Sequence, residues 1–342
     1  MKEVSIIGLD LAKNVFQVHG TGADYMPVVR RKLRRAEVLP FFAKLPACLV
    51  GMEACGGSHY WAREIAALGH DVRLIPPAYV KPFVKRGKTD AADAEAICEA
   101  VSRKSMRFVP IKSADQQATA MVLKVRELLV RQQTQATNAL RAHLNELGII
   151  AATGVAKVAQ LISIVHDQAD ARITDAARFA LKTLVGQIEA LSNELKRLER
   201  AIVAMAKHDP DIQRLATIPG VGAITAASIK ALVPDIGGFK SARHFAAWIG
   251  LTPKPHSSGG KERLGSISKM GNPTLRKLLV LGGMGMLRRA KNNEAGLDWV
   301  RRLLTRRPGK VVAVAMANKT ARIAFALLSK GEVYKKPAAM AA

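Results

Sequence analysis

Two acidic residues are spaced to share one face of a helix. Asp90 and Asp93 stand three residues apart in the segment KTDAADAEAICEA, residues 88–100. Three residues cover roughly 300° of an α-helix, so both carboxylates point to the same side, where like charges repel by a few tenths of a kcal/mol. A helix start would offset that repulsion, with Asp90 as N-cap and Asp93 at position N3, both facing the positive end of the helix dipole.

Two further acidic residues stand at the ends of short apolar segments. Asp10 ends VSIIGLD, and Glu53 ends CLVGME shortly before a Gly-Gly turn. In open α/β sheets, ligand-binding groups gather at the carboxyl ends of the strands, so Asp10 and Glu53 could share one edge with the Asp90 helix laid across it. Taken singly, Asp10 could equally be a turn cap and Glu53 a surface acid, but the joint pattern favours a site.

A cluster of four carboxylates would be costly unless hard cations occupied it. Oxygen ligands of this kind suit Mg²⁺, or alternatively Mn²⁺, bound together with substrate phosphates. Two such ions about 4 Å apart could clamp an in-line phosphoryl displacement. An acidic pocket in a basic chain is therefore typical of a metal-dependent nuclease or transesterase.

The chain as a whole is strongly basic. Its 342 residues include 53 Lys and Arg against 27 Asp and Glu, a formal net charge of +26. A polyanion is the natural partner, and an aromatic content of 5% argues against a protein that reads single strands mainly by stacking on bases. We therefore expect contacts with backbone phosphates to dominate binding.

Cysteine spacing and hydropathy narrow the class of protein. Cys48, Cys55 and Cys98 lack CxxC spacing and a nearby histidine cluster, which speaks against a zinc site or a disulfide framework and favours a reducing compartment. No apolar run approaches the roughly 18 residues needed to span a membrane, and the N-terminal MKEVSIIGLDLAK does not resemble a signal peptide. These features predict a cytoplasmic, nucleoid-associated protein without a membrane partner.

The elements that would position the acids lie in the first 110 residues. A hairpin and a third strand up to about residue 33, followed by helices alternating with strands, predict a mixed or parallel α/β sheet. The segment from about residue 113 to 148, which has no glycine or proline up to Leu147, predicts one long helix, and residues 184–208 predict a second. Together these helices, within residues 111–208, could form an antiparallel coiled-coil spacer or a plain bundle.

The remaining residues predict a mostly α-helical domain over 209–330, with a flexible tail over 331–342. Its segment IPGVG, with Gly220 and Gly222, resembles the turn of a helix-hairpin-helix module, where backbone amides meet a phosphate; a tight turn without a ligand explains the same glycines. A serine-rich loop follows, surrounded by cations that could bind nucleic acid. These cations are Lys254, Lys261, Arg263, Lys269, Arg276 and Lys277.

Several motifs together resemble one known family. The segments IIGLDLAKN, GMEACGG and KTDAADAEAI look like the DEDD tetrad of the RuvC-like (RNase H-like) domain in transposases of the insertion sequence 110 family, relatives of a pilin-gene invertase. The segments IPGVGAITAASI and FAAWIGLTPKPHSSGGKERLGSISKMGNPTLRKLL resemble the C-terminal transposase domain of that family. The resemblance covers most of residues 4–330.

This resemblance implies a role for each matching residue. The tetrad would supply the Mg²⁺ ligands, and Ser258, directly before Gly259, would be the nucleophile, with Ser257 as its alternative. One position departs from the family pattern, because Cys55 replaces a hydroxyl residue after Glu53 and so removes a possible hydrogen bond beside the metal ligand. The tetrad falls on Asp10, Glu53, Asp90 and Asp93.

The resemblance also implies partners. Members of the family are similar to recombinases guided by a structured bridge RNA, whose loops pair with donor and target DNA. Guidance of this kind would let base pairing specify sequence while the protein holds backbone, in keeping with the basic, aromatic-poor composition. The active sites are composite, so a homo-oligomer, a dimer or a tetramer, is expected.

Two other functions stay compatible with the residues alone. A metal-dependent, RuvC-like junction-resolving nuclease would use the four acids and water, with the serine loop dispensable. A non-catalytic nucleic-acid scaffold would use the acids as helix caps, the glycines as turns and Ser257 and Ser258 as caps of the next turn. The leading interpretation is a transposase that recombines DNA by phosphoryl transfer.

Overall fold

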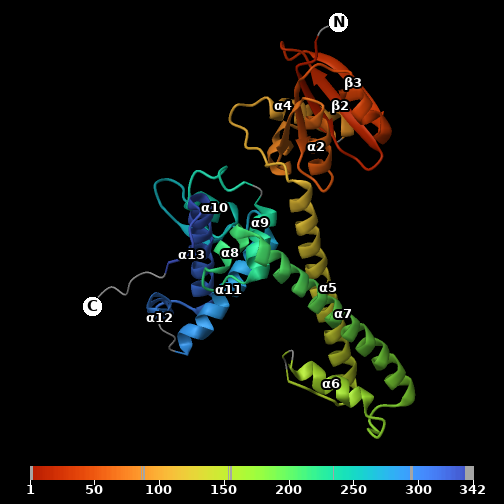
Figure 1. The fold of residues 1–342 in the computed structure, drawn as a ribbon, viewed down its shortest axis with the longest axis vertical. Coiled ribbons are helices and arrows are strands. Elements are labelled where there is room, and N and C mark those ends of the chain that lie inside the picture. Colours follow the sequence, from red (N-terminus) through yellow and green to blue (C-terminus); the bar gives the residue numbers. More distant parts are fainter. Residues whose placement is uncertain are drawn as a thin grey trace. The chain divides into compact units, whose positions relative to one another are not determined.

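The chain forms two compact units, residues 1–117 and 118–342, in the computed structural model (Figure 1). The structure describes residues 3–85, 87, 89–152, 154, 156–233, 235–292 and 296–335, so part of the predicted tail, 336–342, lies outside the described residues. Each unit is described separately below. The finer division of the chain predicted from the sequence stays a prediction.

The first unit is built on a five-stranded mixed sheet, in the order β3-β2-β1-β4-β5. Strands β1 to β3 pair antiparallel, whereas β1, β4 and β5 run parallel. The predicted N-terminal hairpin, third strand and mixed α/β sheet are therefore confirmed, and the fold is consistent with the expected RuvC-like domain. The strands are β1 (Ile6–Asp10), β2 (Val15–Thr21), β3 (Pro27–Arg34), β4 (Leu49–Glu53) and β5 (Asp71–Ile75).

Helices cover both faces of this sheet. Successive side chains of a strand point to opposite faces, and Ile7 and Leu9 of β1 pack with Trp61 on the side of α1 (Val38–Phe42) and α2 (Ser58–Ala67). Helix α4 (Asp90–Val101) packs on the other side, after α3 (Pro77–Val80) and two short 3₁₀ turns at Arg35–Glu37 and Lys81–Phe83.

Two glycines let α4 lie close to the sheet. A Cβ at Gly8 of β1 would fall 2.1 Å from the carbonyl oxygen of Ala94 and 2.4 Å from the amide nitrogen of Cys98. A Cβ at Gly51 of β4 would fall 2.7 Å from the Cβ of Val101. Larger residues on this face of β1 and β4 would push α4 away, so the sequence fixes the height of α4 above the sheet.

The second unit contains two long helices that run antiparallel. They are α5 (Ala114–Glu146) and α7 (Asp175–His208), with α6 (Ala156–His166) packed at their far end (Figure 1). Arg126 Nε of α5 donates to Glu199 Oε1 of α7 at 3.1 Å, and Gln133 Nε2 donates to Ser192 Oγ at 2.8 Å. These pairs recur seven residues apart on both helices. The long helix predicted over 113–148 is confirmed.

Helix α7 begins nine residues before the predicted start at residue 184. Thr174 caps it, accepting a hydrogen bond from the Ala177 amide at 3.4 Å. The first turns invert the usual pattern, because Arg178 is buried while Phe179 is 78% exposed. The Arg178 guanidinium donates to the carbonyl oxygens of Val165, Asp167, Asp170 and Ile173, so it holds the corner between α6 and α7 together.

The rest of the second unit is a helical domain with one small hairpin. Its main core joins α8, α9, α10, α11 and α13, and α12 packs against α11 and α13. The elements are α8 (Pro210–Ala216), α9 (Ala223–Leu232), α10 (Ala242–Trp248), β6 (Pro253–Pro255), β7 (Leu264–Ile267), α11 (Pro273–Lys291), α12 (Asp298–Leu304) and α13 (Gly309–Lys330).

Helix α13 is the element that bears on the expectation about membranes. Among the described residues it is long and apolar enough, by length and composition, to cross a bilayer, although the sequence analysis found no such run. Lys310, Lys319 and Arg322 interrupt its apolar residues, so the sequence of this segment contains no long uninterrupted apolar run. Its buried residues, including Ala317 and Ala321, pack in the core of the helical domain, which is the ordinary role of such a helix.

Candidate active site

Asp10 and Glu53 lie at one corner of the first unit, at the carboxyl ends of adjacent parallel strands. The register aligns Leu9 of β1 with Met52 of β4, so the two acids follow at the same level. Asp10 shares the face of Gly8, and Glu53 shares the face of Gly51, which is the face that α4 covers. Both carboxylates therefore lie at strand ends near the start of α4, as the sequence predicted.

Helix α4 begins at Asp90, but Asp90 is not its N-cap. Thr89 occupies that position in extended conformation, and its Oγ1 accepts a hydrogen bond from the Ala92 amide at 3.2 Å. The predicted cap at Asp90 and the predicted N3 position of Asp93 were therefore wrong by one residue, because a threonine hydroxyl precedes the aspartate and serves the cap. Asp90 and Asp93 both lie in the first turn, and because Thr89 is the N-cap, neither carboxylate is needed to cap the helix.

The four acids interact electrostatically. Partial burial, reinforced by the charges of Asp93, Asp90 and Glu53 in that order, raises the pKa of Asp10 from 3.8 to about 6. Asp10 ends the central strand of the sheet, so its carboxylate lies near those of the other three acids. We call these four residues the acid corner; they are Asp10, Glu53, Asp90 and Asp93.

The acid corner has the donor chemistry for a hard divalent ion. Its carboxylate oxygens suit Mg²⁺ or Mn²⁺, and a bound cation would lower the Asp10 pKa, which burial and the neighbouring acid charges raise. Among the described residues, no group of three or more His, Cys, Asp or Glu side chains is set at metal-holding distances. The other three acids lie close enough to Asp10 to raise its pKa.

The loop after Glu53 contains a hydroxyl that the sequence analysis missed. Ser58, fully buried at the start of α2, accepts from the Cys55 amide at 3.1 Å and donates to the Cys55 carbonyl at 3.0 Å. The Cys55 side chain is exposed and free of any disulfide. A serine hydroxyl therefore lies beside Cys55, three residues later in the chain. In the sequence, Ser58 after the Gly-Gly pair was the signal for this hydroxyl.

The predicted nucleophile stands at the tip of a hairpin in the second unit. Strands β6 and β7 pair antiparallel, and Ser258 is bridged to Lys261 across the two-residue turn Gly259–Gly260. Both glycines have positive φ, +55° and +77°, as two-residue hairpin turns require, and a Cβ on either would meet only open space. Ser258 is therefore exposed on a turn that leaves room for a large substrate.

The two serines of this hairpin differ in their hydrogen bonds. Ser257 Oγ accepts from the amide of Arg263 at 3.2 Å, so its hydroxyl helps to close the hairpin. The backbone carbonyl of Ser258 accepts from the Lys261 amide at 3.1 Å, and its hydroxyl makes no hydrogen bond to any residue that the structure describes. This difference favours Ser258 over Ser257 as a reactive hydroxyl.

The predicted cations divide into exposed and engaged residues. Arg276 Nη1 donates to the carbonyls of Ile249 and Met270 at 2.8 and 2.6 Å, so it braces the loop before α11. Lys269 has a positive φ of +56° in the same loop. The remaining cations of this group are exposed; they are Lys254, Lys261, Arg263 and Lys277, and Lys269 is exposed as well.

The predicted glycine turn lies between α8 and α9. Gly220 has a φ of +83° and packs against α11, where a Cβ at Gly282 would fall 2.2 Å from the Gly220 carbonyl oxygen. Gly222 is the N-cap of α9 and has open space beside it. Gly220 thus serves packing, whereas only Gly222 leaves a helix N-terminus accessible.

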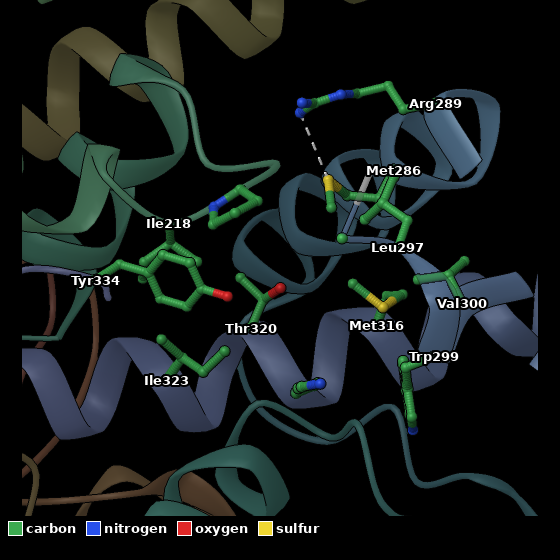
Figure 2. Close-up of a pocket in the computed structure, with 13 residues that line it drawn as sticks. Ile218, Met286, Arg289, Leu297, Trp299, Val300, Met316, Thr320, Ile323 and Tyr334 are labelled. Carbon is green, nitrogen blue, oxygen red and sulfur yellow. Dashed lines mark hydrogen bonds between the residues drawn. The ribbon is translucent and has the colours of Figure 1, made fainter. Parts of the chain in front are cut away.

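A cavity of about 250 Å³ lies elsewhere in the second unit (Figure 2). Its apolar lining includes Ile218 and Met316, and Lys319 Nζ lies 4.4 Å from the centre of the Trp299 ring. Arg289 on α11 points to the Met286 sulfur at 3.8 Å. None of the predicted catalytic residues borders this cavity among the described residues, so it is separate from the serine hairpin.

Two family descriptions match this chain. Residues 212–298 match "Transposase IS116/IS110/IS902 family", and residues 7–149 match the DEDD transposase family of IS110, described as "Transposase". The first match includes the serine hairpin, and the second includes all four residues of the acid corner. The acid corner and the serine hairpin therefore each fall inside a matched region.

Individual relatives extend the similarity over nearly the whole chain. A "Probable family 20 transposase" of Pseudomonas aeruginosa is 49% identical over 97% of this chain and 99% of its own. A "Transposase for insertion sequence element IS1328" of Yersinia enterocolitica is 40% identical over 98% and 100%. A "Pilin gene-inverting protein" of Moraxella lacunata is 24% identical over 83% and 81%.

Proposed function

The chain belongs to the IS116/IS110/IS902 family of transposases, and from this premise we propose that it cleaves and joins donor and target DNA by metal-dependent phosphoryl transfer through a serine. The observation that carries the proposal is the acid corner. Four carboxylates from three elements lie near one another, and partial burial together with the charges of the other three acids raises the Asp10 pKa to about 6, an arrangement that is costly without a cation.

The acid corner would hold divalent metal, with Mg²⁺ as the first candidate. A bound ion would polarise the scissile phosphate and stabilise the charge that develops on its oxygens. Asp10 and Glu53 would act from rigid strand ends, and Asp90 and Asp93 from the first turn of α4. The close packing of α4 at Gly8 and Gly51 supports this role, because it sets where the helical acids stand.

Ser258 would be the nucleophile. Its Oγ attacks the scissile phosphorus, an O–P bond forms to the serine, and the bond to the displaced sugar oxygen breaks while that oxygen gains a proton. A hydroxyl end of the second DNA then attacks the phosphoserine link and returns the serine hydroxyl. The exposed Gly259–Gly260 turn and the nearby Lys254, Lys261 and Arg263 support close approach of a phosphate.

A structured bridge RNA would choose the DNA sequences by base pairing, while the protein holds backbone. The net charge of +26 and the low aromatic content support this division of work. A homo-oligomer, a dimer or a tetramer, would complete each active site by joining the acid corner of one subunit to the serine hairpin of another. A protein that acts on donor and target DNA in this way would be cytoplasmic and associated with the nucleoid.

The long helices would serve as a coiled-coil spacer. The seven-residue recurrence of Arg126–Glu199 and Gln133–Ser192 supports this role, because coiled coils repeat their contacts every seven residues. The α8–α9 turn would act as a helix-hairpin-helix-like element, with the N-terminus of α9 at Gly222 meeting a phosphate.

A denaturing gel for covalent DNA adducts tests the proposed function. The parent protein, with Mg²⁺, bridge RNA and both DNAs, is expected to yield a protein–DNA adduct that Ser258→Ala lacks and Ser257→Ala retains. Cleavage without any adduct would instead favour a junction-resolving nuclease. Loss of the adduct in Ser257→Ala alone would move the nucleophile by one residue.

A further inference from the structure

Strand β3 carries a dense run of cations at the edge of the sheet. Residues 30–35 read RRKLRR, and only Leu33 among them is apolar. Strand β3 is the outer strand beside β2, so one side of its backbone lacks a partner in the sheet. Charge on an edge strand discourages pairing with other chains, and cations on either face would serve that purpose equally.

The pleat of β3 places its cations on two faces with different surroundings. Arg31 and Leu33 point to the side of α1 and α2, where Leu33 is buried in the core. On that side the Arg31 guanidinium lies 5.9 Å from the Phe41 ring centre, and Arg35, beyond the strand, lies 5.0 Å from the Trp61 ring centre. These arginines cover aromatic rings.

The opposite face of β3 continues the face of the acid corner. The strand registers align Asp10 of β1 with Gln17 of β2, and Gln17 with Lys32 of β3. The three side chains therefore form one row across the sheet, and with strands about 4.8 Å apart Lys32 starts about 10 Å from Asp10. Arg34 follows two residues later on the same face, paired with Val15.

Helix α4 supplies an acidic partner to the neighbouring row of side chains but not to the row of Lys32. In the neighbouring row Arg30 pairs with Glu95 of α4 at 3.8 Å, and Lys85 pairs with the same carboxylate at 2.7 Å. Lys32 and Arg34 are exposed, and neither makes an ion pair with any residue that the structure describes. Lys32 and Arg34 thus continue the face of the acid corner across the sheet, away from α4.

We propose that Gln17, Lys32 and Arg34 form a backbone track that holds the DNA strand entering the acid corner, an inference that rests on the proposed function. The track is matched in charge to the phosphates flanking the scissile one. It also offsets the repulsion that four carboxylates exert on incoming DNA. Gln17, between Asp10 and Lys32, supplies amide donors to a phosphate oxygen.

Charge-removing variants on the two faces of one strand test the track. The double variant Lys32→Gln/Arg34→Gln removes the track cations, and Arg31→Gln, the adjacent residue on the opposite face, is the matched control. Binding of the full-length proteins to a labelled DNA strand is measured from about 50 to about 200 mM salt. Loss of two phosphate contacts lowers the slope of log affinity against log salt by about 1.4 on single strands and about 1.8 on duplex.

Over this range of salt, the affinity of the double variant for duplex is expected to fall about tenfold less than that of the parent. The affinity of Arg31→Gln is expected to fall as much as the parent's. Slopes equal to the parent in the double variant, or equally lowered in Arg31→Gln, overturn the track. A larger loss on bridge RNA than on DNA also overturns it, by assigning the face to the guide. Because this readout is binding, it stands apart from adduct formation: a parent that binds through the track yet forms no adduct contradicts the proposed chemistry alone.

Discussion

The acid corner and the serine hairpin are built in contrasting ways. Asp10 and Glu53 meet Asp90 only after three separate segments of the first unit have folded together, with α4 set down on Gly8 and Gly51. Ser258 is presented by one two-residue turn, whose geometry depends on its immediate neighbours. One site depends on long-range packing, and the other on local backbone conformation.

This contrast suits the two kinds of chemistry that we propose for these sites. Metal ligands must hold fixed distances, and rigid strand ends hold them better than loops do. A nucleophile that forms and releases a covalent bond to DNA benefits from an exposed turn that a large substrate can reach. The same contrast predicts that mutations will harm the two sites through different routes.

The largest effect is expected from Asp10→Asn. This variant keeps the shape of the side chain and removes one charge, so we expect adduct formation to fall about a thousandfold, equivalent to about 4 kcal/mol of transition-state stabilisation. Binding of nucleic acid should remain close to that of the parent. Single-turnover adduct yield against Mg²⁺ concentration measures the effect, and parental yield in Asp10→Asn would return Asp10 to a structural role.

The next effect separates packing from local turn geometry. Gly8→Val would drive its side chain into the backbone of Ala94 and Cys98, so we expect a loss of more than about 3 kcal/mol in the first unit. Gly259→Ala meets open space and carries only the strain of a φ of +55°, about 1 kcal/mol. Hydrogen exchange of β1, α4 and the hairpin compares them; unchanged protection of α4 in Gly8→Val would contradict the close packing.

A pH series probes the burial and the charge repulsion that together raise the Asp10 pKa. The folded pKa of Asp10, about 6, lies above its ordinary value of 3.8, so the stability that its proton provides is complete below 3.8 and lost as pH rises through 6. We expect the metal-free parent to lose stability over this range relative to Asp10→Asn. Thermal unfolding of both proteins from pH 4 to pH 7 measures the difference.

The comparison with Asp10→Asn is needed because another group titrates in the opposite direction. Burial, with the charges of Lys112 and Arg63, lowers the pKa of His59 to about 4, so its contribution to stability is lost as pH falls. That contribution is common to parent and variant and cancels in their difference. A difference that does not change with pH would remove Asp10 from the coupled cluster.

The smallest effect distinguishes the two serines by stability. Ser257→Ala loses the hydrogen bond from the Arg263 amide, so we expect the hairpin to lose about 0.5 to 1 kcal/mol. Ser258→Ala loses no bond within the hairpin and should change its stability by less than about 0.5 kcal/mol. Protection of the Arg263 amide from exchange measures both, and equal losses would mean that the serines are interchangeable.

Patterns in the sequence located most of the acid corner. Short apolar segments ending in Asp10 and Glu53 predicted strand ends, and the parallel pairing of β1 with β4 brings such ends together. The spacing of Asp90 and Asp93 predicted a shared helical face near a helix start. The cap itself was misassigned, because an aspartate and a threonine are both good caps and only the backbone conformation at Thr89 decides between them.

Other features depend on contacts that spacing does not encode. The start of α7 was missed because a buried Arg178 and an exposed Phe179 reverse the expected periodicity, and four carbonyls of the corner between α6 and α7 satisfy that arginine. Arg276 resembled its cationic neighbours in sequence, although it binds two backbone carbonyls. Its engagement follows from the loop folded around it.

The repeated contacts between α5 and α7 limit how the length of this pair of helices can change. A helix rises 1.5 Å and turns about 100° per residue, so one residue added to either helix would rotate every later side chain off its partner. Seven residues added to both helices would restore the register of Arg126 with Glu199 and Gln133 with Ser192, and would lengthen the pair by about 10 Å. The length of this helix pair can therefore change only in steps of seven residues. Related chains should differ in this region by the same number of heptads in both helices.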